Sequence, residues 1–128
     1  VPDQDPDQVF EQVREHVTDE EPLATVERLG SFPPVATPLD EPGAEPVRAA
    51  LREAWDAPPV ELLLLGGSLP AAYLGRALEA PILVVPYANP DQNNHAPNEH
   101  LDLDCFKNGI RTSAALVERF ADFRADDS

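Results

Sequence analysis

The chain has almost no lysine and almost no cysteine. Lys107 is the single lysine and Cys105 the single cysteine among 128 residues. One cysteine excludes an internal disulfide and a structural zinc site built from several cysteines. Its apolar neighbours, Leu103 and Phe106, favour a buried and unreactive thiol.

Positive charge is scarce throughout. Nine basic residues stand against twenty-four acidic ones, which gives a formal net charge of −15. Because phosphate binding needs a basic surface, we expect no nucleic-acid partner. An acid-rich surface with little lysine suits a protein that stays soluble in concentrated salt, where screening weakens self-repulsion. The composition therefore favours a halophilic, cytoplasmic protein, and the alternative is an ordinary acidic one.

Long apolar runs are also missing. No stretch approaches the roughly 20 apolar residues of a membrane span, and the acidic N-terminus has no feature of a secretory signal. We therefore expect no membrane partner. The sequence opens at Val1 without a methionine, which indicates a fragment of a longer protein.

Hydrophobic residues make up 42% of the chain, enough for one modest core, and fifteen prolines divide it into short elements. Apolar spacing predicts helices over 6–17, 44–56, 70–79 and 103–123, the first of them capped by Asp5. In the last helix we expect one apolar stripe to face inward. Its members are Phe106, Ile110, Ala114, Val117 and either Phe120 or Ala121.

The centre of the chain predicts a parallel sheet. A nearly unbroken apolar run at 60–65 leads through a turn at 66–68 into the helix at 70–79, and a second apolar run, PILVVPY, follows at 81–87. Continuous apolar runs are typical of strands that are covered on both faces. Strand, turn, helix and strand form a βαβ unit, so the expected fold class is α/β.

Two connections should lie at the same edge of this sheet. In a right-handed βαβ unit both strands run in one direction, so the turn at 66–68 and the loop at 87–102 both leave the carboxyl edge. Open α/β sheets place their sites at that edge. The loop holds two of the three histidines, His95 and His100. We therefore expect it to carry chemistry.

The turn consists of Gly66, Gly67 and Ser68. At the start of a helix these residues could offer peptide N–H groups and a hydroxyl to a carboxylate or an oxyanion. A sequence of this kind is often only a connection, and that interpretation stays open.

In the loop, a neutral imidazole nitrogen of His95 could bind a divalent metal ion, with Asn98 and Glu99 orienting the ring. The alternative is an ordinary solvent-exposed loop histidine. His100 and Asp102 could also supply two ligands, but Asp102 lies directly before a helix and fits a helix cap better. Asn89 and Asp91 are interpreted as turn residues.

Three motifs together resemble a known family. Gly-Gly-Ser-x-Pro at 66–70, His-Ala-Pro-Asn-Glu at 95–99 and GIRTSAAL at 109–116 occur in this order and at this spacing. They resemble the C-terminal end of the dinuclear zinc metallopeptidases that include carnosinase-like dipeptidases, acetylornithine deacetylase and succinyl-diaminopimelate desuccinylase. The resemblance covers most of the chain.

The resemblance implies a domain organisation. Residues 1–40 would be the C-terminal end of an α+β lid or dimerisation domain. Residues 41–128 would be the C-terminal segment of the catalytic domain, the βαβ portion of its parallel sheet. A homodimer is a further expectation from this likeness.

The resemblance also implies roles for single residues. His95 matches the last metal ligand of the family, and Asn98 and Glu99 match the end of the same motif. Gly66, Gly67 and Ser68 match the turn that contacts substrate near the metal ions. Leu64 and Leu65 stand where many dipeptidases carry a charged pair before this turn, so the substrate preference does not carry over.

The implied activity is hydrolysis of small peptides or N-acyl amino acids with two zinc ions, for which cobalt or manganese can substitute. In the family, four further ligands and the general base come from an N-terminal segment that these residues do not include. We therefore assign no catalytic residue, and expect the chain alone to be inactive and to bind zinc weakly. The alternative is a non-enzymatic remnant or interaction module that retains the fold.

Overall fold

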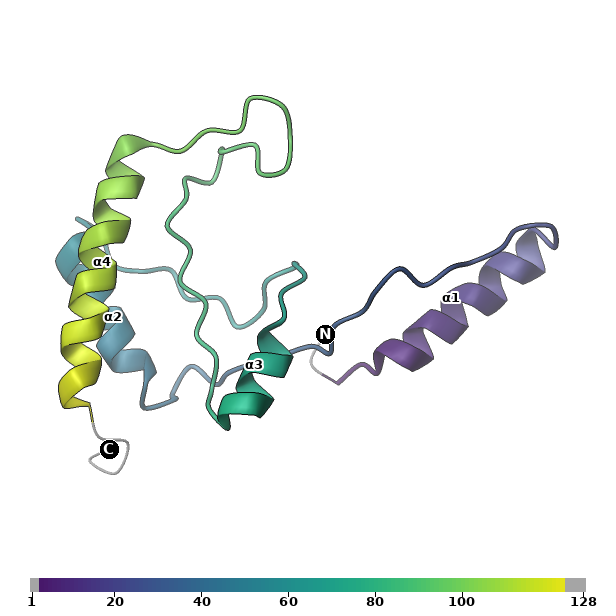
Figure 1. Ribbon diagram of the computed structural model, residues 1–128, viewed down its shortest axis with the longest axis horizontal. Coiled ribbons are helices and arrows are strands. Elements are labelled where there is room, and N and C mark those ends of the chain that lie inside the picture. The colour runs from purple at the N-terminus through teal and green to yellow at the C-terminus, as the bar shows by residue number, and fades with distance from the viewer. Residues whose placement is uncertain (1–2, 124–128) are drawn as a thin grey trace. The chain divides into compact units, whose positions relative to one another are not determined.

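The computed structural model describes residues 3–123, and in that range it contains four helices and no β-strand (Figure 1). The helices are α1 (Pro6–Glu20), α2 (Ala44–Ala54), α3 (Ala71–Leu78) and α4 (Leu103–Asp122). All four helices predicted from apolar spacing are confirmed. The largest difference in length is at the end of α1, which continues beyond the predicted residue 17 to Glu20.

The chain divides into two compact units, and each is assembled from two separate stretches of sequence. Unit 1 comprises Val1–Thr37 and Leu62–Ile82, and so contains α1 and α3. Unit 2 comprises Pro38–Glu61 and Leu83–Ser128, and so contains α2 and α4. The domain boundary expected at residue 40 stays a prediction.

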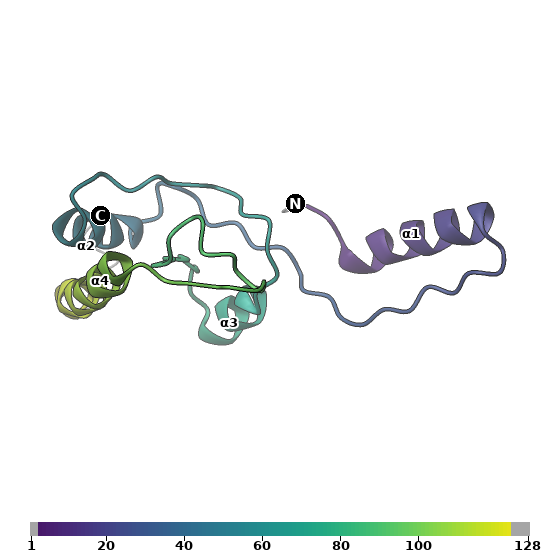
Figure 2. The same cartoon turned by 90° about the horizontal axis from the view of Figure 1, so that it is seen from above.

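In unit 1, α1 begins as the sequence predicts. The Asp5 carboxylate accepts a hydrogen bond of 2.8 Å from the Asp7 N–H, which satisfies one of the unpaired donors in the first turn. Arg28 then fastens the following segment to the helix, with an ion pair to Asp7 at 2.5 Å and its guanidinium 5.6 Å from the centre of the Phe10 ring. This segment runs back alongside α1 (Figure 2).

Also in unit 1, α3 ends where the chain folds back onto it. Glu79 adopts a left-handed conformation with φ 50°, and the Ala80 N–H donates to the Gly75 carbonyl at 3.1 Å. A Cβ on Gly75 would lie 3.3 Å from both the Ala80 oxygen and the Ile82 side chain. Glycine at position 75 therefore gives residues 80–82 room to pack on the helix.

The core of unit 2 lies between α2 and α4, which lie side by side in both views (Figures 1 and 2). The contact is made by small side chains, with Ala50 and Thr112 at 0% exposure and Ala115 at 5%. Small residues let two helices approach closely. The Trp55 indole N–H donates to the Thr112 hydroxyl at 3.0 Å, so this buried polar atom is paired.

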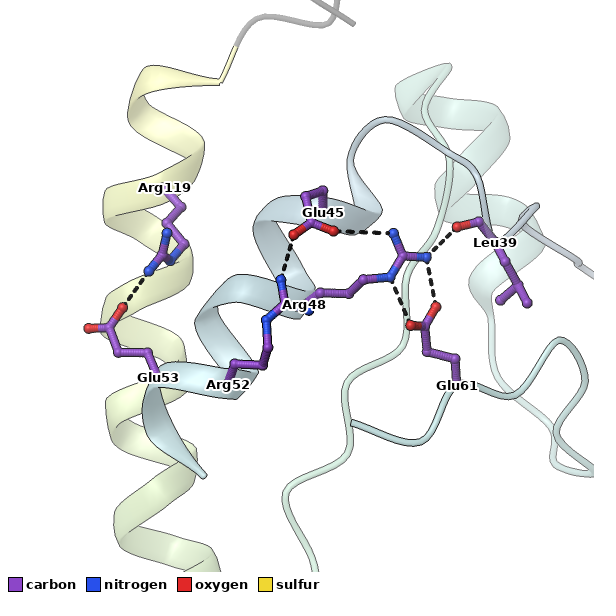
Figure 3. A network of polar contacts seen from close by, with 7 residues as sticks. All are labelled: Leu39, Glu45, Arg48, Arg52, Glu53, Glu61 and Arg119. Atoms are coloured by element: carbon purple, nitrogen blue, oxygen red, sulfur yellow. Dashed lines mark hydrogen bonds and ion pairs between the residues drawn. The ribbon is translucent and has the colours of Figure 1, made fainter. Parts of the chain in front are cut away.

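Ion pairs surround α2 in unit 2 (Figure 3). Arg48 donates from two nitrogens to the Glu61 carboxylate at 2.7 and 2.8 Å, and also to the Leu39 carbonyl. The Arg119 guanidinium on α4 pairs with Glu53 on α2 at 2.6 Å.

The side-chain hydrogen bonds from Arg48 lower the pKa of Glu61 against the opposing effect of desolvation. The pair therefore stabilises the fold above the ordinary glutamate pKa, and this contribution is lost as the pH falls through the lowered pKa.

The predicted inward face of α4 was wrong. Phe106, Ile110 and Val117 are 54%, 57% and 74% exposed, whereas Gly109, Thr112 and Ala115 are buried. The reason is the close approach of α2, which only the stripe of small residues allows. The larger apolar side chains form a second stripe on the same helix, and hydrophobic spacing does not tell which stripe meets which neighbour.

The two apolar runs, at 60–65 and 81–87, form neither a helix nor a strand within residues 3–123. In the first run, Val60 is 86% exposed and Leu65 is 67% exposed. The parallel sheet and the βαβ unit stay predictions. Among the described helices, none combines the length and apolar character that a membrane crossing requires.

Candidate functional site

The candidate site is the polar loop at residues 88–102, which we call the His95 loop. It belongs to unit 2 and leads directly into the N-terminal end of α4 (Figure 1). All of its residues from Asn93 to Asp102 are exposed, whereas Asn89 near its start is 4% exposed. An exposed loop on a packed helix pair is a common support for functional side chains.

Asn89 holds the two ends of the loop together with its side-chain amide. Its Oδ1 accepts a hydrogen bond of 3.0 Å from the Asp102 N–H, and its Nδ2 donates to the Asp91 carboxylate at 2.7 Å. Asp102 is the N-cap residue of α4, as the sequence predicts, but its own side chain makes no capping hydrogen bond. The bond to Asn89 instead ties this helix end to the start of the loop.

Three backbone hydrogen bonds fold the loop between these ends. Gln92 N–H donates to the Asn89 carbonyl at 3.3 Å, Ala96 N–H to the Asn93 carbonyl at 2.9 Å, and His100 N–H to the Gln92 carbonyl at 3.0 Å. The last bond spans eight residues of sequence and encloses His95. The histidine therefore sits within a closed backbone ring rather than on an open tether.

His95 itself has a left-handed backbone. Its φ is 60°, and Asn93 and Asn98 on either side have φ of 57° and 62°. This conformation costs a residue with a Cβ about 1–2 kcal/mol, although asparagine and histidine adopt it more readily than most. Such conformations persist where surrounding contacts determine them, and they are concentrated at functional sites.

The His95 ring is exposed and makes no hydrogen bond within residues 3–123. A neutral imidazole in that state has a ring nitrogen free to coordinate a metal ion. Asn98 and Glu99 are exposed as well, and the Asn98 carbonyl oxygen lies 3.3 Å from His100 Nδ1. The expected role of Asn98 and Glu99 in orienting His95 stays a prediction.

The charge on Asp91 is favoured by its surroundings. The hydrogen bond from the Asn89 amide, followed by a backbone hydrogen bond, lowers the pKa of Asp91, and the nearby His100 acts in the same direction. An ionised Asp91 accepts the Asn89 N–H hydrogen bond more strongly than a protonated one. The carboxylate therefore keeps the Asn89 side chain oriented with its oxygen toward Asp102.

The segment just before the loop is packed on α4. A Cβ on Gly109 would lie 2.9 Å from the Tyr87 ring, so only glycine at this helical position lets the ring lie so close. The Ser113 hydroxyl, one turn further along α4, donates to the Tyr87 hydroxyl at 3.2 Å. The chain is thus attached to α4 at both ends of the loop, at Tyr87 before it and at Asp102 at its end.

The predicted glycine–serine turn lies in unit 1, and two residues separate it from the start of α3. Gly66, Gly67 and Ser68 are all exposed, and a Cβ built on either glycine would meet no atom within 4 Å. Neither glycine has a positive φ. The local fold therefore gives no steric reason for glycine at these positions, which leaves room for the close approach of another group. A site shared by this turn and His95 stays a prediction.

The described residues do not contain a complete metal-binding group. Among residues 3–123 no group of three or more histidine, cysteine, aspartate and glutamate side chains is placed to hold a metal ion. The exposed, unbonded ring of His95 fits one ligand position. A complete coordination shell is therefore not formed by residues 3–123.

Comparison with known families decides the relationship. The model of peptidase family M20/M25/M40 matches residues 3–119. The chain belongs to this peptidase family. Its membership confirms the predicted resemblance at the level of the family and a metal-dependent peptidase or hydrolase as the kind of function. No curated protein and no solved structure matches the chain.

Sequence reasoning missed the roles of two residues that hold the base of the His95 loop in this M20-family chain. Asn89 was interpreted as a turn residue, and the Asn-Pro pair at 89–90 is the signal for that interpretation. Its burial and its bond to Asp102 depend on the return of the chain, which no local pattern reports. Gly109 lies inside the GIRTSAAL motif, and a glycine within a predicted helix is the signal that a neighbour approaches closely.

Proposed function

We propose that the chain is the C-terminal part of a dinuclear zinc peptidase that hydrolyses small peptides or N-acyl amino acids, and that His95 supplies one of its metal ligands. The observation that carries the proposal is the exposed, unbonded imidazole of His95 inside a closed loop. Family membership over residues 3–119 supports the class of reaction.

Each candidate residue has one task in this proposal. His95 holds a metal ion through a neutral ring nitrogen, and Asn98 and Glu99 keep the ring in orientation. The peptide N–H groups of Gly66 and Gly67, with the Ser68 hydroxyl, bind the negative oxygens of the substrate. When bound, the two metal ions supply Lewis-acid activation of the scissile carbonyl.

The metal is zinc in this proposal, with cobalt or manganese as substitutes. A single imidazole binds zinc weakly, because structural and catalytic sites use three or four protein ligands. The other ligands and the general base come from an N-terminal segment of the peptidase, which is therefore a required partner. A homodimer through residues 1–40 belongs to the same proposal.

The proposal is tested by complementation. The chain is co-expressed with the N-terminal catalytic part of a peptidase of the same family, and the purified pair is assayed with dipeptides and N-acyl amino acids. We expect amino-acid release that a chelator abolishes and added zinc restores. Each polypeptide alone is the control and should be inactive. Absence of zinc-dependent release in the assembled pair would contradict the proposal and favour an interaction module.

The acidic composition supports a halophilic, cytoplasmic peptidase. At a net charge of −15, self-repulsion strains the compact state in dilute buffer. We expect the melting temperature to rise by about 4 °C or more between 0.1 and 1 M KCl, equivalent to roughly 1 kcal/mol, as the screening length falls from about 10 to about 3 Å. Thermal unfolding followed by circular dichroism at several salt concentrations measures this. A melting temperature that stays flat or falls would contradict the halophilic interpretation.

A further inference from the structure

Asn89 is one of two buried polar residues in the described chain, and the only one that the packing of α2 on α4 does not explain. The other, Thr112, lies in the helix interface and is paired with Trp55. Asn89 lies at the base of an exposed loop, yet is 4% exposed. Burying an amide costs free energy unless both its oxygen and its nitrogen find partners. Both do so here, at Asp102 and Asp91.

The hydrogen bond that Asn89 accepts from Asp102 closes the loop around His95. Asn89 Oδ1 and the Asp102 N–H are thirteen residues apart in sequence, and His95 lies near the midpoint of the intervening chain. Joining the two ends removes most of the conformations that a free connection of this length would sample. On the helix side, Asp102 is the first residue before α4, so the tie is anchored to the longest helix of the described chain.

A second contact fixes the same base from the other side. Tyr87, two residues before Asn89, packs against Gly109 so closely that a Cβ there would lie 2.9 Å from the ring. The chain therefore enters the loop from a fixed point on α4 and returns to α4 at Asp102, with Asn89 joining entrance and exit.

We infer that Asn89 is a positioning residue that closes the loop at its base and thereby holds His95 in its left-handed, outward conformation for metal binding. The inference rests on the proposed function in one respect, the role of His95 as a ligand. With the hydrogen bond between Asn89 and Asp102 intact, the imidazole of His95 already has the orientation that metal binding requires. Without it, the loop must be ordered when the metal binds, and that ordering lowers the affinity.

The first test uses the chain alone and nuclear magnetic resonance. In Asn89→Ala we expect the order parameter of the His95 amide to fall from about 0.85 to below about 0.6. The Asp102 amide should exchange about tenfold faster, because it loses its acceptor. Helix content and Trp55 fluorescence should stay unchanged, since Trp55 reports the α2–α4 core. Asn94→Ala, an exposed change in the same loop, is the matched control and should alter neither value.

A pair of substitutions separates the hydrogen-bond tie from general packing. Asn89→Asp keeps an acceptor for the Asp102 N–H but places a carboxylate against Asp91, so the loop should loosen as in Asn89→Ala. Combined with Asp91→Asn, the amide and the carboxylate have exchanged places, and both hydrogen bonds can form again. We expect the double variant to recover the His95 order parameter and the slow exchange of the Asp102 amide.

The second test measures zinc in the complemented pair by competition with a chromophoric chelator. Asn89→Ala should raise the zinc dissociation constant about 10–100-fold, as the loss of a group that orients a ligand does, and the exchanged pair should restore it. If His95→Asn leaves zinc binding unchanged, the proposed ligand is wrong, and the positioning inference is overturned with it even where the loop measurements agree. If His95→Asn removes a zinc ion but Asn89→Ala changes neither loop order nor zinc affinity, the positioning inference alone is overturned. It is also overturned if Asn89→Ala lowers helix content together with loop order, because Asn89 is then a general stabilising residue.

Discussion

Replacing His95 by asparagine is expected to lower zinc-dependent hydrolysis by the complemented peptidase about 100-fold or more. Loss of groups that only orient a metal ligand costs about 10–100-fold, so loss of the ligand itself should cost at least the upper value. Asparagine suits the test because it adopts the left-handed conformation of residue 95, at φ 60°, as readily as histidine does. The measurements are kcat/KM and the zinc content of the assembled pair.

His100→Asn is the matched control. His100 lies in the same exposed loop, and its ring nitrogen Nδ1 lies 3.3 Å from the Asn98 carbonyl oxygen. We expect His100→Asn to retain most of the activity and the full zinc content. An equal loss of kcat/KM in the two variants would show that hydrolysis depends on both histidine rings and not on His95 in particular. Full activity in His95→Asn would exclude the ligand role of His95.

Replacing Ala50 by aspartate is expected to lower the free energy of unfolding of unit 2 by several kcal/mol and to separate α2 from α4. Ala50 is 0% exposed in the contact between α2 and α4, so a carboxylate there would lose its water inside the packed interface. The Trp55 side chain, which donates to Thr112 across this interface, should report the separation by a shift in its fluorescence. Urea unfolding followed by Trp55 fluorescence measures the change in the free energy of unfolding.

Ala114→Asp provides the comparison on α4. Ala114 is exposed, so the same substitution should cost less than about 1 kcal/mol, mostly through the weaker helix propensity of aspartate. If the two variants unfold at the same urea concentration, the α2–α4 contact is not the core of unit 2.

Helix positions were predictable from the sequence because each helix carries its own local signals. Asp5 with Pro6 marks the start of α1, and Pro58 with Pro59 follows the end of α2. The orientation of α4 was not predictable, since its largest apolar residues and its smallest ones both recur at helical spacing. Which stripe is buried depends on the neighbouring helix α2. The stripe of small residues is buried because α2 and α4 approach closely.

In the candidate site, too, some residues were predictable from the sequence and others were not. His95 was identified from a motif, and its exposed ring in a closed loop agrees with that motif without testing the coordination. Asn89 was missed because its partner Asp102 is thirteen residues away, beyond any turn rule. The left-handed backbone of His95 was missed as well, since most histidines do not adopt it and the loop hydrogen bonds link residues up to eight positions apart.

The interleaved make-up of the two units bears on the order in which the chain acquires structure during synthesis. α2 emerges from the ribosome long before α4, because the first ends at Ala54 and the second begins at Leu103. Until α4 has been synthesised, Ala50 and Ala54 have no helix to pack against. At elongation rates of about 5–20 residues per second, this interval lasts several seconds. Contacts so distant in sequence also slow refolding of the finished chain. A ribosome that stalls before Leu103 would therefore release a product with α2 uncovered, a natural target for chaperones and proteases.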